Sequence, residues 1–228
     1  MKRIIQPELL DTLPPDDPRA RHSRRDLCRI NWWMRNHAIM ANALQNFSPA
    51  VPQSIIELGA GDGKFLLRVA QRISSRWQDV QAKLLDLQSN VSAETLMSFD
   101  EFGWRAEAVV ADVLDGIPDS AADQIVIANL FLHHFEDARL SELLGKISCQ
   151  TKLFIAVEPR RFSLASLVRP LLWLIGCNGV TRHDAVVSIR AGFSGAEISA
   201  LWPDKKNWQL TERRAGIFSH LFIARRRE

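Results

Sequence analysis

Residues 55–67 have the sequence IIELGAGDGKFLL, which joins three features in one continuous piece. Two β-branched residues lead into Glu57, as in a buried strand, and an apolar stripe with helical spacing begins at Phe65. Between them, glycine occupies every second position from Gly59 to Gly63. Glycine lets the backbone take positive φ or approach a ligand closely, because it has no Cβ. The stretch therefore predicts a strand, a turn and a helix that form one wall of a nucleotide-type pocket.

The charge around this turn restricts the ligand that it can accept. Dinucleotide-binding turns have the spacing G-x-G-x-x-G and place a pyrophosphate at the helix N-terminus. Here the spacing is G-x-G-x-G, and Glu57 and Asp62 put two carboxylates beside the loop. These carboxylates would repel a pyrophosphate, whereas a ligand with an amine or a sulfonium group would suit them.

Strands and helices are predicted to alternate after this turn, which implies a mostly parallel sheet with right-handed crossovers. Two closing strands flank Gly216 and predict a hairpin, so one of them must run antiparallel to the others. The expected strands are 53–58, 80–87, 105–111, 123–129, 153–157, 207–213 and 217–224, and the expected helices are 63–76, 92–102, 136–148 and 194–201. The predicted class is α/β, a Rossmann-like sheet of seven strands with helices on both faces.

The two regions outside this alternation are the N-terminus and residues 160–190. Residues 1–20 predict an extended arm with several prolines, followed by a helix over 23–47 with Ser23 as its N-cap. Residues 160–190 predict an apolar segment over 162–175 and then an irregular polar stretch. The apolar segment is a buried core helix, a cap over an apolar ligand, or a membrane-surface element, and the sequence leaves these alternatives open.

Composition excludes several classes of protein. A chain of 228 residues with 46% hydrophobic and 24% charged residues is typical of one globular domain. Its net charge of +3 is mild. The sequence has no basic stretch rich in aromatic residues, which would be typical of nucleic-acid binding. The longest apolar run is shorter than the roughly 20 residues that a bilayer requires. Three widely spaced cysteines indicate neither disulfides nor a metal site, so we expect a cytoplasmic protein without a metal.

Polar residues follow successive predicted strands, and ligands of such sheets bind beyond the carboxyl ends of the strands. Glu57, Asp86, Asp112 and Asn129 are therefore expected to converge although they are distant in sequence. Together with the glycine turn and the order of the elements, they make the chain similar to class I S-adenosylmethionine-dependent methyltransferases of the small-molecule type. More loosely, the chain resembles methyltransferases of bacterial polyketide and phenolic-lipid pathways, and the ring C-methyltransferases of ubiquinone and menaquinone synthesis.

This resemblance implies S-adenosylmethionine as cofactor and assigns residues to it. In the family, the residue that ends the second strand, here Asp86, accepts from the ribose hydroxyls, and the residue that ends the third, here Asp112, meets the adenine amino group. Glu57 and Asp62 would serve the amino group of the methionine moiety. The full set of expected cofactor-binding residues is Glu57, Gly59, Ala60, Gly61, Asp62, Asp86, Leu87, Asp112, Val113 and Asn129.

The acceptor is less constrained by the sequence. Enzymes that methylate DNA adenine or protein glutamine carry Asn/Asp-Pro-Pro-Tyr after the fourth strand, but this chain has Asn129-Leu130-Phe131 there and no tyrosine at all. A small, apolar, aromatic or polyketide-like acceptor is therefore favoured. Histidine suits the removal of a hydroxyl proton, because its pKa lies near ~6.5. The candidate catalytic residues are His133, His134, His183 and Asp184.

These candidates favour O-methylation, with ring C-methylation as the alternative and a non-catalytic, cofactor-binding partner protein as a further one. The expected organisation is an N-terminal arm and helix on the substrate side, residues 1–48, and a methyltransferase domain, residues 49–228. Residues 160–190 would be a substrate-cap insertion in that domain. We expect a small-molecule partner, no nucleic acid and no membrane insertion, and a homodimer remains open.

Overall fold

The computed structural model describes residues 2–14, 16–48, 50–88, 90–116, 124–163 and 165–227. The strands in these ranges are β1 (Ser54–Leu58), β2 (Val80–Asp86), β3 (Trp104–Val110), β4 (Gln124–Asn129), β5 (Leu153–Pro159), β6 (Trp208–Ala215) and β7 (Ser219–Arg226). The α-helices are α1 (Leu9–Thr12), α2 (Pro18–Met34), α3 (Asn36–Phe47), α4 (Lys64–Ile73), α5 (Ala93–Asp100), α6 (Asp137–Gln150), α7 (Val168–Leu174), α8 (Gly179–Ala191) and α9 (Glu197–Leu201).

In the described ranges, seven strands form one sheet in the order β3-β2-β1-β4-β5-β7-β6. The first five strands of this order pair in parallel, and β7 runs antiparallel to both β5 and β6. The predicted α/β class, with its terminal antiparallel hairpin, is confirmed. The chain order reverses at β1, whose neighbours are β2 and β4. A ligand crevice is expected at this switch point, beyond the carboxyl ends of the strands.

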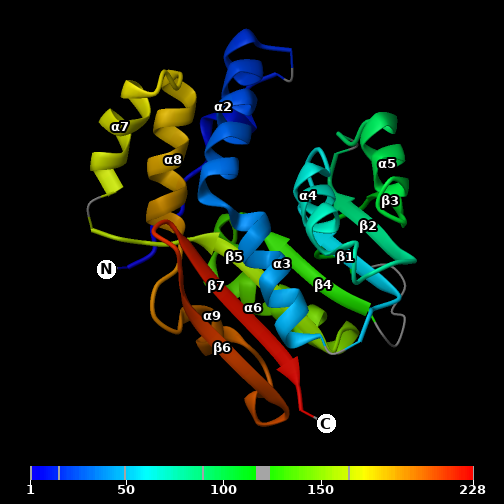
Figure 1. Ribbon diagram of the computed structural model, residues 1–228. Coiled ribbons are helices and arrows are strands. Elements are labelled where there is room, and N and C mark those ends of the chain that lie inside the picture. The colour runs from blue at the N-terminus through cyan, green and yellow to red at the C-terminus, as the bar shows by residue number, and fades with distance from the viewer. Residues whose placement is uncertain are drawn as a thin grey trace.

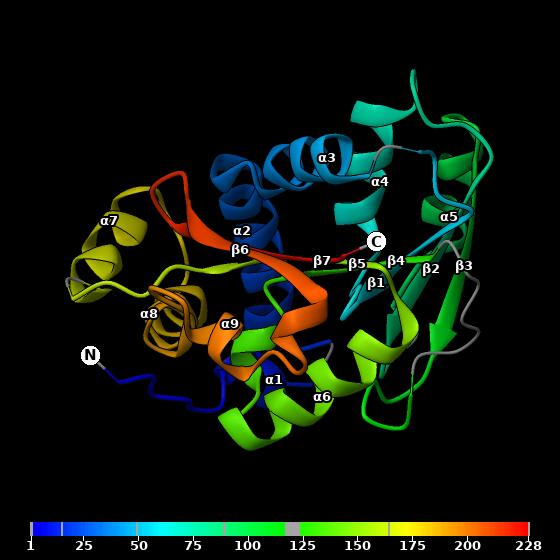
Figure 2. The same cartoon turned by 90° about the horizontal axis from the view of Figure 1, so that it is seen from below.

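Helices cover both faces of the sheet, with α3 and α4 on one side and α6 and α9 on the other (Figure 2). Successive side chains of a strand point to opposite faces, so adjacent residues of β1 belong to different cores. Ile55 packs with Leu44 and Leu66 on the α3–α4 side, whereas Ile56 packs with α6 and Trp202 on the other side. Both faces of the central strands are therefore buried, which fixes the carboxyl edge of the sheet as a rigid platform.

The helix predicted over 23–47 is two helices, and it begins earlier than expected. The α2 helix starts at Pro18, where the Asp17 carboxylate accepts from the backbone N–H of Arg19. It ends at Met34, and Arg35, whose φ is +54°, separates it from α3. Ser23 is no N-cap: its hydroxyl is buried and accepts from Thr181 of α8.

Residues 160–190 also differ from the prediction. The stretch expected to be irregular forms α8, and Asn178 caps it by accepting from the backbone N–H of Thr181. Within the described part of the apolar segment, α7 buries Leu172 but exposes Leu171, Trp173 and Leu174. The core-helix alternative is therefore wrong for α7. Leu164 of the same segment lies outside the described residues.

The helices α2, α7 and α8 stand beyond the carboxyl ends of the parallel strands (Figure 1). They belong to the two regions that lay outside the predicted alternation, so these regions come together on the side of the sheet where a ligand is expected. Among the described residues, we found no helix whose length and hydropathy would let it span a bilayer.

Trp202 provides a test of the core on the α6–α9 side. Its ring lies 5.8 Å from Phe154, 5.0 Å from Trp208 and 5.4 Å from Phe222, and only 2% of the residue is exposed. We expect Trp202→Ala to lower the free energy of unfolding by about 3–5 kcal/mol, because it leaves a large cavity. Trp173→Ala is the matched control, since Trp173 is 65% exposed, and it should cost less than about 0.5 kcal/mol. Guanidinium denaturation measures both values, and equal losses would contradict this description of the core.

Candidate functional site

The glycine turn after β1 has the backbone that the sequence predicts. Gly59, Gly61 and Gly63 have φ values of +68°, +56° and +73°, in the left-handed region that residues with a Cβ rarely adopt. A Cβ on Gly59 would lie 2.2 Å from the Phe131 ring, so only glycine allows the turn and this ring to pack together. A Cβ on Gly61 would meet nothing within 4 Å, which leaves this side of the turn open.

The strand next to β1 holds this turn in place. The backbone N–H of Ala60 donates to the Leu85 carbonyl at 3.0 Å, and that of Gly61 donates to Asp86 Oδ2 at 2.9 Å. The other oxygen of Asp86 accepts from the backbone N–H of Gln88 at 3.0 Å. Asp86 therefore ties the end of β2 to the loop, and its carboxylate still has free lone pairs, because each oxygen can accept twice.

A cavity of about 300 Å³ opens above the turn. Eight of the predicted site residues line it: Glu57, Gly59, Ala60, Gly61, Asp62, Asn129, His133 and His134. It is closed by side chains from the N-terminal segment, α2 and α8: Glu8, Leu27, Asn31 and Ser188. The carboxyl edge of the sheet thus meets both of the regions that lay outside the predicted alternation.

Four predicted cofactor-binding residues do not line this cavity, although they lie at neighbouring strand ends. Asp86 ends β2 and Leu87 follows it, while Asp112 and Val113 follow β3. The two strand ends are joined by the bond from the Ala111 N–H to the Asp86 carbonyl, at 3.1 Å. Asp112 Oδ1 accepts from the Leu114 N–H at 2.8 Å, so it shapes its own turn. Leu87 is exposed and Val113 is buried.

Glu57 is a buried carboxyl group at the floor of the site, and one of its oxygens, Oε2, has no hydrogen-bond partner among the described residues. Burial raises the pKa of Glu57 well above its usual range, and the nearby carboxylates Asp62 and Asp86 raise it further. The backbone N–H of Leu66, in the first turn of α4, acts in the opposite direction. A cationic ligand in the cavity would satisfy this carboxylate.

Asn129 and Asp62 have partners within the protein. Asn129 Oδ1 accepts from Asn36 Nδ2 at 3.0 Å, which connects the end of β4 to the start of α3. Asp62 accepts from the Lys64 N–H at 3.2 Å and pairs with its ammonium at 2.9 Å, so it caps α4 while it lines the cavity. Both side chains keep oxygen lone pairs that a ligand can use.

A buried carboxylate at the end of β5 organises the turn that follows β4. Glu158 accepts from the backbone N–H groups of Phe131, Leu132 and His133 at 3.0, 2.9 and 3.3 Å. Its Oε2 also lies 2.9 Å from Nδ1 of His133. The imidazole of His133 is therefore fixed in orientation, and its Nε2 is directed away from Glu158.

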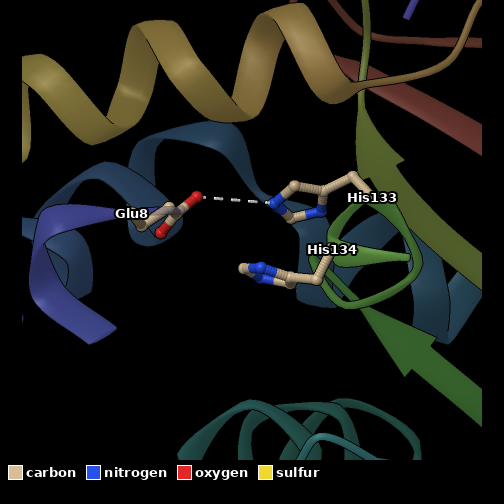
Figure 3. A group of neighbouring side chains, drawn as sticks. All are labelled: Glu8, His133 and His134. Atoms are coloured by element: carbon tan, nitrogen blue, oxygen red, sulfur yellow. Dashed lines mark ion pairs between the residues drawn. The ribbon is translucent and has the colours of Figure 1, made fainter. Parts of the chain in front are cut away.

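That Nε2 faces Glu8, which comes from the N-terminal segment (Figure 3). The two groups form an ion pair at 3.7 Å, and the ring of His134 lies beside them, 4.2 Å from the His133 ring. Glu8 is itself held by the hydroxyl of Ser188 on α8. Glu8, His133 and His134 form a cluster, called here the EHH cluster.

Electrostatics distinguishes the members of the EHH cluster. Burial alone would lower the pKa of His133, but Glu158 and Glu8 raise it to about 9. Burial and the neighbouring His133 lower the pKa of His134. Burial would raise the pKa of Glu8, yet the two histidines and Ser188 together hold it below its usual range. Near neutral pH, His133 is therefore a cation between two carboxylates and His134 is neutral.

The EHH cluster also lines a second cavity, of about 640 Å³. The other residues around this cavity come from the N-terminal segment, from the start of α6 and from α8: Ile5, Gln6, Pro7, Phe135, Glu136, Arg139, Val187 and Ala191. Since Glu8, His133 and His134 belong to both linings, the cluster lies at the junction of the two cavities.

His183 and Asp184 are not brought to either cavity. Both lie on α8, where Asp184 is buried and accepts from the backbone N–H groups of Leu9 and Leu10 at 2.8 and 3.0 Å. His183 is partly exposed, with Nδ1 3.0 Å from Asp184. Asp184 therefore anchors α1, and the geometry gives the predicted catalytic role of this pair no support.

Sequence reasoning missed two residues of the site. Glu158 is the next-to-last residue of β5 and could have been found by the rule that identified Glu57, Asp86, Asp112 and Asn129, because it too is a polar residue near a carboxyl end. Glu8 gave no such signal, since it lies in a segment rich in proline and acidic residues and is held at the site by tertiary contacts such as that with Ser188 of α8.

Comparisons with known proteins agree with this geometry at the level of fold. No family model matches the sequence, and no curated protein matches it. Among solved structures, the plantazolicin methyltransferase BpumL in complex with SAH is similar with a TM-score of 0.65, at 12% identity over 93% of this chain and 92% of that one. The chain has the fold of class I methyltransferases.

Two other similar structures are longer than this chain. The mitomycin 7-O-methyltransferase MmcR is similar with a TM-score of 0.60, at 16% identity over 96% of this chain. An O-methyltransferase family protein from Burkholderia thailandensis is similar with a TM-score of 0.57, at 19% identity over 93% of this chain. The chain spans only 60% and 64% of their respective lengths.

The role of Asp184 as an anchor can be tested by its removal. Asp184→Ala deletes a charged acceptor of two backbone N–H groups, so we expect a loss of about 1.5–3 kcal/mol in unfolding free energy. Hydrogen exchange at Leu9 and Leu10 should accelerate. Arg190→Ala, the control on the same helix, should change stability by less than about 0.5 kcal/mol, because Arg190 is exposed. Unchanged exchange at Leu9 and Leu10 in Asp184→Ala would contradict the anchor.

Proposed function

We propose that this protein is an enzyme that transfers a methyl group from S-adenosylmethionine to a small, apolar acceptor. The observation that carries the proposal is one cavity in which the glycine turn and the buried, unpartnered Glu57 meet the EHH cluster. A site for a cationic nucleotide-like donor thus adjoins groups that can handle a proton. Because a fold alone does not determine a function, the function is inferred from the groups of this site.

The residues fit S-adenosylmethionine. The ammonium of its methionine moiety matches Glu57 Oε2, which lacks a donor among the described residues. Gly61 lets the ligand approach the turn, because nothing lies within 4 Å of the position its Cβ would take. The lone pairs of Asp86 suit the ribose hydroxyls, and Asp112 with Leu87 and Val113 would flank the adenine at the ends of β2 and β3. SAH, bound in the BpumL structure, is the product that this donor leaves after transfer.

Methyl transfer requires little covalent chemistry from the protein. The donor supplies an activated methyl group, and the protein contributes in-line positioning and removal of the acceptor's proton. Both ring nitrogens of His133 face carboxylates. His134 is the member of the EHH cluster that can take a proton directly, because its ring borders both cavities without such a partner. We assign no part in the transfer to His183 and Asp184.

The second cavity is the proposed place of the acceptor. It reaches the donor cavity at the EHH cluster, and its walls include Ile5, Pro7, Phe135 and Val187. Residues 1–48 and 160–190 would then act as the substrate side of the enzyme, and residues 49–228 as its methyltransferase domain. The exposed apolar face of α7 would extend this side as a cap over an apolar acceptor.

A phenol or another hydroxyl of a polyketide-like or quinone-like metabolite is the favoured acceptor. Proton handling by the EHH cluster favours O-methylation, and MmcR is by its name a 7-O-methyltransferase of mitomycin. Ring C-methylation is the alternative within the same class. A cytoplasmic enzyme of secondary metabolism fits this proposal, and nucleic acid is not among the partners we propose.

Glu57→Gln tests the donor site through two opposite effects. The pKa of Glu57 is higher in the folded state than in the unfolded state. The folded protein therefore loses stability as pH rises from the unfolded pKa towards the folded one. We expect Glu57→Gln to raise the melting temperature, with a larger gain at pH 8 than at pH 5. We also expect SAH affinity to fall roughly 10–100-fold, because a charged hydrogen bond contributes about 1.5–3 kcal/mol.

Thermal unfolding and titration calorimetry with SAH measure these two effects. Glu94→Gln is the control, since Glu94 is an exposed carboxylate on α5, and it should alter neither quantity. Absence of SAH binding by the native protein would refute the proposed cofactor. If the melting temperatures of Glu57→Gln and the native protein differed by the same amount at pH 5 and pH 8, the raised pKa of Glu57 would be contradicted.

The transfer itself can be followed with S-adenosylmethionine labelled in its methyl group. We expect label in phenols recovered by organic extraction, and none in RNA. His134→Ala should lower turnover by roughly 10²–10⁴-fold, as loss of a general base does, while SAH still binds. His37→Ala, which removes a histidine outside both cavities, should retain full turnover. SAH binding without transfer to any phenol or quinone would favour the non-catalytic partner, and label in RNA would favour a different enzyme class.

A further inference from the structure

We propose that the EHH cluster is a binding site for one divalent transition-metal ion of the zinc type. One carboxylate oxygen of Glu8 and one ring nitrogen each of His133 and His134 lie within 4.8 Å of one another. The spacing of the cysteines predicted no metal, but these ligands are not cysteines, and they come from two segments that are 125 positions apart, at 8 and 133.

The ligand types fit such an ion. Imidazole nitrogens with one carboxylate oxygen are the donors of catalytic zinc sites, which keep a further position open. Two ligands at about 2.0–2.2 Å from a tetrahedral ion lie about 3.3 Å apart. His133 Nε2 and Glu8 Oε1 are 3.7 Å apart, which is too long for a hydrogen bond and close to the spacing that a shared ion requires.

The surroundings of His133 are those of a metal ligand. Its Nδ1 is 2.9 Å from Glu158, and this carboxylate is fixed by three backbone N–H groups. Carboxylates in this position orient ligating histidines and fix their tautomer. The Nε2 atom that remains is buried and has no hydrogen-bond partner among the described residues. It is directed into the space between Glu8 and His134 (Figure 3).

The other two ligands are positioned from different sides. Ser188 on α8 holds the carboxylate of Glu8, and Asp184 on the same helix holds the backbone just after it. His134 belongs to the same turn as His133, and it is the exposed member of the group. The site is therefore open towards the two cavities, and metal binding would replace the proton on His133 Nε2.

The open position would receive the acceptor's oxygen, a step that rests on the proposed function. Coordination lowers the pKa of a bound hydroxyl, whose proton then passes to water. An oxygen lone pair forms the bond to the methyl carbon, and the electrons of the sulfur–carbon bond stay on sulfur, which leaves SAH. With the ion bound, His134 would act on the hydroxyl through the metal as one of its ligands, so His134→Ala would lower turnover by removing the ion.

Titration of the chelator-treated full chain with Zn²⁺ tests the site without any assay of activity. We expect one equivalent to bind in competition with a chromophoric chelator. Glu8→Gln keeps the size and the bond to Ser188 but supplies a poor ligand, and we expect it and His134→Ala each to weaken binding at least roughly tenfold. Co²⁺ should give the intense visible absorption of a four-coordinate ion, which both variants lose.

His37→Ala is the matched control, because Arg35, Arg68 and Arg72 surround this histidine and disfavour a cation. It should leave Zn²⁺ affinity unchanged. No stoichiometric binding, or equal affinity in native protein, Glu8→Gln and His134→Ala, would overturn the site. Methyl transfer that is unaffected by the chelator would overturn the ion's part in the reaction. SAH binding to the same metal-free protein, measured in parallel, separates these results from a failure of the proposed function.

Discussion

The carboxylate of Glu158 is the interaction on which the geometry of the site depends. It lies at the end of β5, fully buried, and receives three consecutive backbone N–H groups from the turn after β4 as well as the imidazole of His133. A buried charge is tolerated only when such donors surround it. The turn therefore cannot rearrange without exposing this charge to an apolar core. Its fixed shape places Phe131 against Gly59 and both histidines at the junction of the two cavities.

The N-terminal segment is the second constraint, because it completes the site from outside the sheet. Arg3 donates to the carbonyls of Ala191 and Phe135 and pairs with Asp137, so it joins α8 to the start of α6. Five residues later Glu8 enters the cavity, and Asp184 holds the chain directly after it. Such a segment buries few apolar groups of its own, and its position depends on these polar contacts with α8. The N-terminal segment and residues 160–190, which are far apart in the sequence, thus form one wall of the site.

The parts of the fold that could be predicted are those that local chemistry determines. The glycine turn, the alternation of strands and helices, and the closing hairpin all follow from patterns within about 15 residues. Convergence of Glu57 and Asn129 on one cavity followed from a topological rule for parallel sheets. The break at Arg35 was not predictable, because a non-glycine residue with positive φ gives no sequence signal. The α8 helix was missed because its buried face contains Thr181 and Asp184, whose partners lie on α2 and α1.

The buried carboxylates of this protein differ in how their charge is compensated, and the difference separates structure from function. Asp26, Glu158 and Asp184 each accept from donors within the chain. Among the described residues, Glu57 Oε2 is the one buried carboxylate oxygen without such a donor. An unsatisfied buried polar group costs about 1–3 kcal/mol, and glutamine would avoid the charge at nearly the same size. The fold bears this cost at the floor of the cavity, next to the glycine turn and within reach of a ligand. A carboxylate there is useful only if a cation from outside the chain completes it, and that requirement matches the ammonium of the proposed methyl donor.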